Sequence, residues 1–392
     1  MKKITIFNHE PLIQRNYQYY QIDELISLGY EVEYISLNNC YTNIKYNNIL
    51  DSPINKEVQN YKELSKLLIN YKECTCFLEL PLELKTLKIF ILINKHFSLI
   101  IKTNFFYQTF LLDKNSFKNK LFDYFYRIFD YKAYKSFVNL INRKLAAIVT
   151  NLLKIRLYDI VFTPGTSGHL LYEKVCNINH PDYENRKNVE SVKRKYEYSV
   201  FLDCYLPYHP DLEKLNQKSI NPEVYFCKMN KIFQRFENQI GTKIIVAAHP
   251  KAKYVKNEFL GREVLYGKTI NLVKGAKYVL THNSLSINFA LIFGKPIYLI
   301  LLNEFVISKG YEWNALRNDG RLINILSDIY KCPIITENSQ IDTHLNSTEN
   351  YELTLKEYLV ADNTKNNAQL YIEYIERFYE KKRMDNIYSD GI

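Results

Sequence analysis

Three apolar runs in the second half of the chain end on polar side chains whose chemistry suits group transfer. Asp203 ends the first run, and His249-Pro250 ends the second. The third run leads into the hydroxyl-rich stretch "THNSLS" at residues 281–286. In open α/β sheets ligands bind at the carboxyl ends of the strands, so a carboxylate, an imidazole and hydroxyls would line one crevice.

Each of these features also has a purely structural interpretation. Proline ends a strand and suits the first turn of a helix, so His249-Pro250 is either a simple turn or a helix start that binds phosphate. A helix is predicted to begin near Ser284 or Ser286 and to end at Gly294. A serine at its start is either the N-cap or a ligand to phosphate, and the residue types leave both open.

Apolar runs that alternate with helical patterns indicate the fold class. A polar, charged stretch without a hydrophobic period at residues 179–197 interrupts the alternation and predicts a domain boundary. The sequence therefore predicts an α/β protein with two Rossmann-like domains and largely parallel sheets. The predicted strands lie at residues 3–7, 31–37, 74–80, 97–102, 158–165, 198–203, 242–250, 277–284 and 295–302.

Two domains and a final helix account for the length of 392 residues, which is more than one core usually serves. The N-terminal domain is predicted at residues 1–190, with a basic helical insertion at about 105–156, and the C-terminal domain at 191–365. A helix and tail occupy 366–392. The apolar positions with helical spacing in this helix are Leu370, Tyr371, Ile375 and Phe378.

Composition favours a cytoplasmic protein. The seven cysteines are scattered and odd in number, and we expect them to be reduced packing residues. The N-terminal apolar run is too short for a signal peptide. No stretch approaches the ~18–20 uninterrupted apolar residues of a membrane-spanning helix.

Positive charge is concentrated in the first half. Residues 101–156 hold eleven Lys and Arg against three Asp, which is +8 of the net +10. Residues 114–156 are predicted to form a helical hairpin or one long helix with an apolar face. That face either packs on the sheet or brings the protein to an anionic membrane surface. No nucleic-acid-binding motif accompanies the charge, so nucleic acid is not expected as a partner. The predicted apolar positions are Phe117, Leu121, Phe125, Ile128, Phe129, Phe137, Leu140, Ile141 and Leu145.

The N-terminal domain is expected to bind the acceptor. The stretch "TPGTSGH" at residues 163–169 follows an apolar strand. Thr166 and Ser167 either cap the next helix in a tight turn or hold an acceptor hydroxyl or a donor phosphate.

The order of the strand-end motifs resembles that of bacterial glycosyltransferases that use CMP-activated sugars, the sialyltransferases and Kdo transferases. The resemblance covers residues 198–302 and rests on Asp203, on His249-Pro250 and on the serine-rich turn before "FGKP". It implies the GT-B architecture, in which two Rossmann-like domains face a central cleft and a C-terminal helix crosses back to the first domain. The second acid and the glycine of the sialyltransferase motif are missing. The serines are separated by one residue, whereas the family's hydroxyls are adjacent.

The resemblance also implies roles for these residues. Asp203 corresponds to the general base, which takes the proton of the acceptor hydroxyl. His249 is the second expected catalytic residue. The donor-binding residues, aimed at the phosphate of the leaving group, would be His249, Pro250, Asn283, Ser284 and Ser286. Further candidates for the site are His209, Asp211, Thr166, Ser167 and His282. No metal or other cofactor is expected, because the chemistry does not require one and no Asp-x-Asp motif is present.

The expected activity is an inverting, metal-independent transfer of a nonulosonate or Kdo-type sugar from CMP to a glycan of capsule, lipopolysaccharide or lipooligosaccharide. The alternatives are a CDP-polyol phosphotransferase of the teichoic-acid type, a nucleotide-sugar epimerase and a non-catalytic, membrane-associated component of capsule assembly. The expected partners are a CMP-sugar, a glycan or glycolipid acceptor and, through residues 114–156, the inner face of the cytoplasmic membrane.

Overall fold

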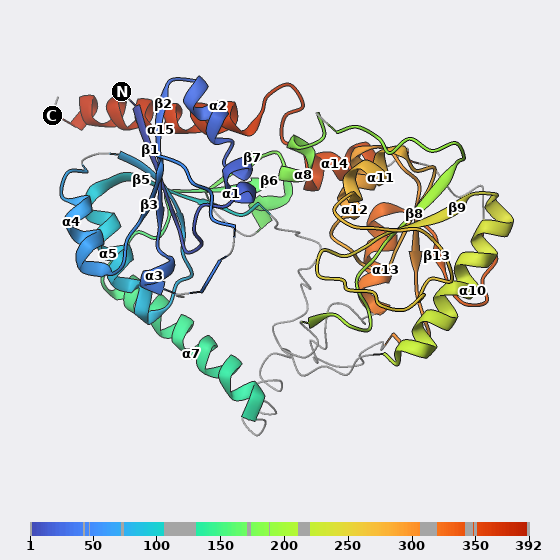
Figure 1. Cartoon of the computed structure of the whole chain (residues 1–392). Coiled ribbons are helices and arrows are strands. Elements are labelled where there is room, and N and C mark those ends of the chain that lie inside the picture. The colour runs from blue at the N-terminus through green and yellow to red at the C-terminus, as the bar shows by residue number, and fades with distance from the viewer. Residues whose placement is uncertain are drawn as a thin grey trace. The chain divides into compact units, whose positions relative to one another are not determined.

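The computed structural model describes residues 2–389, with gaps at 42–43, 47, 72–73, 106–130, 171–173, 188, 211–219, 306–319, 342–347 and 349–350. The described residues form two compact α/β units (Figure 1). The first unit combines the chain up to residue 184 with residues 360–389, and the second runs from 185 to 359.

The first unit contains a parallel sheet of seven strands within the described residues. From one edge to the other, these are β3 (Asn55–Glu57), β2 (Tyr30–Ser36), β1 (Lys2–Asn8), β4 (Cys74–Glu79), β5 (Phe97–Thr103), β6 (Ile160–Pro164) and β7 (Val175–Ile178). The helical elements are α1 (Gln14–Tyr19), α2 (Ile22–Ser27), α3 (Asn38–Tyr41), α4 (Tyr61–Leu68), η1 (Leu84–Thr86), α5 (Leu87–His96), α7 (Tyr131–Leu152), η3 (Ser167–Leu170), α8 (Pro181–Glu184) and α15 (Asn367–Ser389).

Helices cover both faces of this sheet, which explains why its strands are apolar without strict alternation. On one face Ile4 and Ile6 of β1 pack in a cluster that includes residues of α2 and α15. On the other face Phe7 packs with residues of α4 and α5.

The C-terminal helix α15 belongs to the first unit, as expected from the GT-B resemblance. It lies beside α2 (Figure 1). Its buried Tyr371 stacks on Phe162 at 5.0 Å between ring centroids and meets Phe77 edge-on at 5.4 Å. The predicted inward positions Leu370, Tyr371 and Ile375 are buried, and Phe378 packs against the same cluster.

The second unit contains a parallel sheet of six strands within its described part. Their order is β10 (Val264–Leu265), β9 (Lys243–Ala247), β8 (Tyr198–Leu202), β11 (Val279–Thr281), β12 (Ile297–Ile300) and β13 (Ile334–Ile335). The helices are α10 (Pro222–Ile240), α11 (Thr269–Gly275), α12 (Ile287–Ile292), α13 (Gly320–Tyr330) and α14 (Tyr351–Tyr358).

Local sequence explains the bounds of the long helix α10. The Asn221 side chain accepts hydrogen bonds from the backbone N–H groups of Glu223 and Val224, and Pro222 occupies the first turn. Gly241 ends the helix with a φ of 77°, a left-handed conformation that glycine adopts without a steric penalty.

The basic helical segment is described only in part. Helix α7 begins at Tyr131, and the predicted helical residues 114–130 lie outside the described residues. Of the two alternatives for the apolar face, packing on the sheet does not hold for Ile141 and Leu145, because these residues are 40% and 44% exposed. None of the helices, as far as they are described, is long and apolar enough to cross a membrane.

Candidate functional site

The three predicted strand ends of the second unit are neighbours. In the sheet β8 lies between β9 and β11. From β8 the chain continues to β9 and β10 on one side of β8, and later to β11, β12 and β13 on its other side. The carboxyl end of β8 is therefore a topological switch point. This is where open α/β sheets bind ligands.

Asp203, directly after β8, joins two of these strand ends. Its Oδ2 accepts hydrogen bonds from the His249 backbone N–H at 3.1 Å and from the Tyr254 hydroxyl at 2.8 Å. Its Oδ1 accepts from the Tyr205 backbone N–H at 2.7 Å. Burial raises the pKa of Asp203 to about 6, although these hydrogen bonds oppose the rise. Asp203 thus fixes the position of the His249 backbone.

This burial differs from the sequence-based expectation of an accessible catalytic base. The Asp203 side chain is only 3% exposed, and both of its oxygens accept hydrogen bonds within the protein. A base must reach the proton it removes within about 2.6–3.2 Å or through one water. In this structure the Asp203 carboxylate is hydrogen-bonded to the backbone of Tyr205 and His249 and to the Tyr254 hydroxyl.

His249 is half-buried, and its hydrogen bonding defines its tautomer. Its Nδ1 accepts a hydrogen bond from the Lys251 backbone N–H at 3.1 Å. A neutral imidazole that accepts at Nδ1 carries its proton on Nε2, so Nε2 is a hydrogen-bond donor. Such a donor at a strand end suits an anionic ligand.

Two rings hold the His249 side chain. The Tyr205 ring is stacked parallel to it at 6.4 Å between centroids, and the His209 ring meets it edge-on at 4.8 Å. His209, a further candidate for the base, is buried. Asp211, the other candidate, lies outside the described residues.

Pro250 does not begin a helix, contrary to one interpretation of its sequence. The Ala252 backbone N–H donates to the His249 carbonyl at 2.8 Å, which closes a single turn with Pro250 at its second position. Proline favours this position because its fixed φ matches the turn. Of the two interpretations of His249-Pro250, the structure therefore shows the simple turn and no helix start.

The serine-rich turn follows β11 and leads into α12, as predicted. Ser286 is the N-cap residue of α12 but makes no capping hydrogen bond through its side chain. The Ser284 hydroxyl instead accepts from the Ser286 backbone N–H at 3.3 Å. The Cys204 thiol donates a hydrogen bond to the Asn283 Oδ1 at 3.6 Å. Because Cys204 directly follows Asp203, this contact brings the ends of β8 and β11 together.

His282, proposed from the sequence as a further site residue, faces the core instead. Its Nδ1 donates to the Ile300 carbonyl at 2.8 Å, and its Nε2 accepts from the Tyr225 hydroxyl at 3.0 Å. Burial lowers the pKa of this fully buried imidazole to about 4. Both ring nitrogens have protein partners, so its role is structural.

Thr166 and Ser167 belong to the first unit: Thr166 lies in the turn after β6, and Ser167 is the first residue of η3. Ser167 is buried. A Cβ on Gly168 would lie 1.9 Å from the Thr163 hydroxyl oxygen, so only glycine fits there.

A cavity of about 420 Å³ lies at the carboxyl ends of β1, β4 and β5 in the first unit. β1 and β4 are adjacent and flank the switch point of this sheet, so the cavity has the usual position of a ligand site. Polar groups and aromatic rings line it, among them Asn8, Glu10, Tyr19, Glu79, Asn104 and Phe105. Sugars are commonly bound by this combination of hydrogen-bonding groups and flat apolar surfaces.

Glu79 is a carboxylate of this cavity whose pKa is raised well above its ordinary value. The backbone N–H and the hydroxyl of Thr103 both donate to Oε1, the former at 2.6 Å. Within the described part of the chain both of these hydrogen bonds go to Oε1, and Oε2 accepts neither of them. Burial raises the pKa of Glu79 to about 7. A general base works best with a pKa close to the operating pH.

Sequence reasoning missed Glu79, although a signal was present. The stretch "CTCFLEL" was correctly predicted to be a strand, and Glu79 is the charged residue at its carboxyl end. Asp203 was chosen because it is a polar residue at the carboxyl end of a strand, and the same rule selects Glu79.

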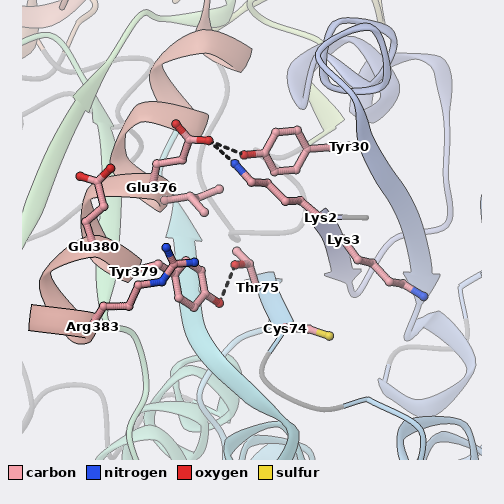
Figure 2. Close-up of a pocket in the computed structure, with 10 residues that line it drawn as sticks. Lys2, Lys3, Tyr30, Cys74, Thr75, Glu376, Tyr379, Glu380 and Arg383 are labelled. Atoms are coloured by element: carbon pink, nitrogen blue, oxygen red, sulfur yellow. Dashed lines mark hydrogen bonds and ion pairs between the residues drawn. The ribbon is translucent and has the colours of Figure 1, made fainter. Parts of the chain in front are cut away.

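A second cavity, of about 440 Å³, lies at the other end of the strands of the first sheet. It is lined by the amino ends of β1 and β4 and by helix α15 (Figure 2). Figure 2 shows the Glu376 carboxylate facing Lys2 and Tyr30, with hydrogen bonds to both. The hydroxyls of Thr75 and Tyr379 are hydrogen-bonded at 3.0 Å. These pairs attach α15 to the sheet, so we assign the polar groups here to stability.

Comparisons with known proteins identify the fold. No protein-family model matches the sequence, and no curated protein matches it. Among solved structures, the glycotransferase of kitacinnamycin is similar with a TM-score of 0.52 and 12% identity over 96% of this chain and 98% of that one. Spinosyn forosaminyltransferase has a TM-score of 0.48 and 9% identity, with 96% and 99% covered. UDP-GlcNAc 2-epimerase from Methanocaldococcus jannaschii has a TM-score of 0.45 and 12% identity, with 94% and 95% covered. Two parallel-sheet units and a final helix on the first unit give this chain the GT-B fold.

Proposed function

We propose that this protein is a glycosyltransferase whose second unit binds a nucleotide-sugar through His249. The observation that carries the proposal is the hydrogen bond from the Lys251 backbone to His249 Nδ1. It makes Nε2 a donor at the switch point of a GT-B sheet, where the phosphate of a donor substrate would be bound.

The donor that we propose is a CMP-activated nonulosonate or Kdo-type sugar. The support is the order of Asp203, His249-Pro250 and the serine turn, together with their adjacency at the ends of β8, β9 and β11. Asn283, Ser284 and Ser286 would assist His249, and no step requires a metal. A capsule or lipopolysaccharide glycan is the proposed acceptor.

The first-unit cavity is the proposed acceptor site, and Glu79 is the proposed general base. Its carboxylate would take the proton of the acceptor hydroxyl as that oxygen attacks the anomeric carbon. The bond from the anomeric carbon to the phosphate oxygen breaks, and CMP leaves with its phosphate hydrogen-bonded by His249 Nε2–H. Inversion follows from this single displacement.

A thermal-shift panel of CMP, CDP, UDP and GDP tests the donor class. A ligand that binds the folded state raises the melting temperature according to its affinity, and we expect CMP to give the largest shift. The His249→Ala variant should lose most of that shift while its own melting temperature stays close to that of the parent. The His169→Ala variant, which removes an exposed histidine of the first unit, should keep the shift.

The other outcomes separate the alternatives. The largest shift with CDP would favour a polyol-phosphate transferase, and a shift with UDP alone would refute the CMP-sugar proposal. No shift with any nucleotide would favour a non-catalytic role in capsule assembly. A CMP shift that His249→Ala leaves intact would show that His249 is only a turn residue.

A further inference from the structure

Helix α7 carries a row of apolar side chains on its exposed side. Val138, Ile141, Leu145, Ile148 and Leu152 are 42%, 40%, 44%, 53% and 76% exposed. They are spaced alternately three and four residues apart, which aligns them along one side of a helix. At ~1.5 Å per residue the row is about 21 Å long. Contiguous exposed apolar surface of this kind marks an interaction site.

A different side of α7 attaches it to the first unit. Ala146 and Thr150 are buried. The Asn142 Oδ1 accepts a hydrogen bond from the Leu84 backbone N–H of η1 at 2.9 Å. The exposed row is therefore not needed to hold the helix in place.

Charge identifies the kind of partner. Residues 131–156 contain six Lys and Arg and no Asp or Glu. Arg143 and Lys144 are exposed on the same helix as the apolar row, and Lys154 is exposed just after the helix ends. A second copy packed against this row in a coiled coil would bring two all-basic helices together, and like charges repel. An anionic lipid surface accepts both the apolar side chains and the positive charge.

We infer that the row Val138, Ile141, Leu145, Ile148 and Leu152 binds the protein to an anionic membrane surface, with α7 lying in the interface. Membrane binding by α7 is argued from its exposed apolar row and its charge. Only the suggestion that the acceptor is a glycolipid rests on the proposed glycosyltransferase function. Helix α7 contacts η1, which closely follows β4, and β4 ends at the cavity residue Glu79. Membrane attachment through α7 suits an acceptor that is itself a glycolipid.

Co-sedimentation with vesicles tests the inference. The probes are vesicles of phosphatidylcholine alone and of phosphatidylcholine mixed with phosphatidylglycerol. We expect binding to the anionic vesicles only, and weaker binding as salt rises. The triple variant Ile141→Ser, Leu145→Ser, Ile148→Ser should lower the partition coefficient about tenfold or more. The pair Arg143→Gln, Lys144→Gln should lower it at low salt and have less effect at high salt.

The control carries three exposed apolar residues replaced elsewhere, Ile69→Ser, Val255→Ser and Leu353→Ser, and it should bind vesicles like the parent. Equal binding of the triple variant and the control would overturn the inference. So would a parent dimer that the triple variant converts to a monomer, because the row would then bind a second copy. The CMP thermal shift should be the same in all variants. A lost CMP thermal shift would count against the proposed function. Lost vesicle binding with an unchanged CMP shift would report on α7 alone.

Discussion

Replacing Glu79 with glutamine should stabilise the first unit at neutral and alkaline pH. Burial raises the pKa of Glu79 from 4.5 to about 7. Between these values the folded state holds a proton that the unfolded state releases, so stability falls as pH rises through this window. At 1.36 kcal/mol per pKa unit, the ionised side chain costs about 3 kcal/mol at most above pH 7. Glutamine has no charge to bury and still accepts the Thr103 hydrogen bonds.

Hydrogen exchange measured on peptides from β4 and β5 reports this effect locally. At about pH 8 these peptides should exchange up to about a hundredfold more slowly in Glu79→Gln than in the parent, and at about pH 5 the two should match. The matched control is Glu24→Gln, which replaces an exposed carboxylate of α2 and should change neither value. Equal or faster exchange in Glu79→Gln at the higher pH would refute the assignment of a raised pKa.

The same variant separates stability from catalysis. Loss of a general base lowers rates about 10²–10⁴-fold, so sugar transfer from the donor selected by the nucleotide panel should fall by that factor. The CMP thermal shift should stay unchanged, because Glu79 belongs to the first unit and His249 to the second. Full transfer activity in Glu79→Gln would remove it from the reaction even if the stability result holds.

Two further changes test positions that the structure singles out. Asp203→Asn cannot accept all three hydrogen bonds to the carboxylate, so CMP affinity should fall about 10–100-fold by titration calorimetry; retained affinity with lost transfer would instead make Asp203 the base, as its sequence motif implies. Asn179→Ala removes a fully buried amide that hydrogen-bonds the backbone of Ala361, Asp362 and Lys365, so limited proteolysis should release α15 faster. Lys381→Ala, an exposed position of α15, should leave the rate unchanged.

The interior of both sheets was predictable because central strands are buried on both faces and are therefore continuously apolar. All nine predicted strands are present, with ends shifted by a few residues. The four strands that were missed, β3, β7, β10 and β13, are the edges of the two sheets. An edge strand pairs on one side only and is often short, as the two-residue β10 and β13 show, so it leaves little hydrophobic pattern to detect.

The site was less predictable than the fold, because its chemistry depends on contacts that are distant in sequence. Residue order placed Asp203, His249 and Asn283 at strand ends, and the sheet order brings them together. The Asp203 carboxylate is covered in part by Tyr254, which lies fifty-one residues away in the sequence and whose hydroxyl donates a hydrogen bond to it. The tautomer of His249 depends on a backbone turn that the sequence permits but does not distinguish from a helix start.

Glu79 and Asp203 have raised pKa values for the same reason, yet their carboxylates differ in hydrogen bonding and in access. Burial is the largest cause in both cases. Asp203 is almost fully buried and has protein donors on both oxygens, so a substrate hydroxyl has little access to its carboxylate. Glu79 takes its Thr103 hydrogen bonds on Oε1 and lines a cavity large enough for a sugar ring. Its pKa of about 7 leaves it ionised in a substantial fraction of molecules at neutral pH and basic enough to take a hydroxyl proton as attack begins. The assignment of the base to the first unit follows from this difference in access, since the two pKa values alone do not decide it.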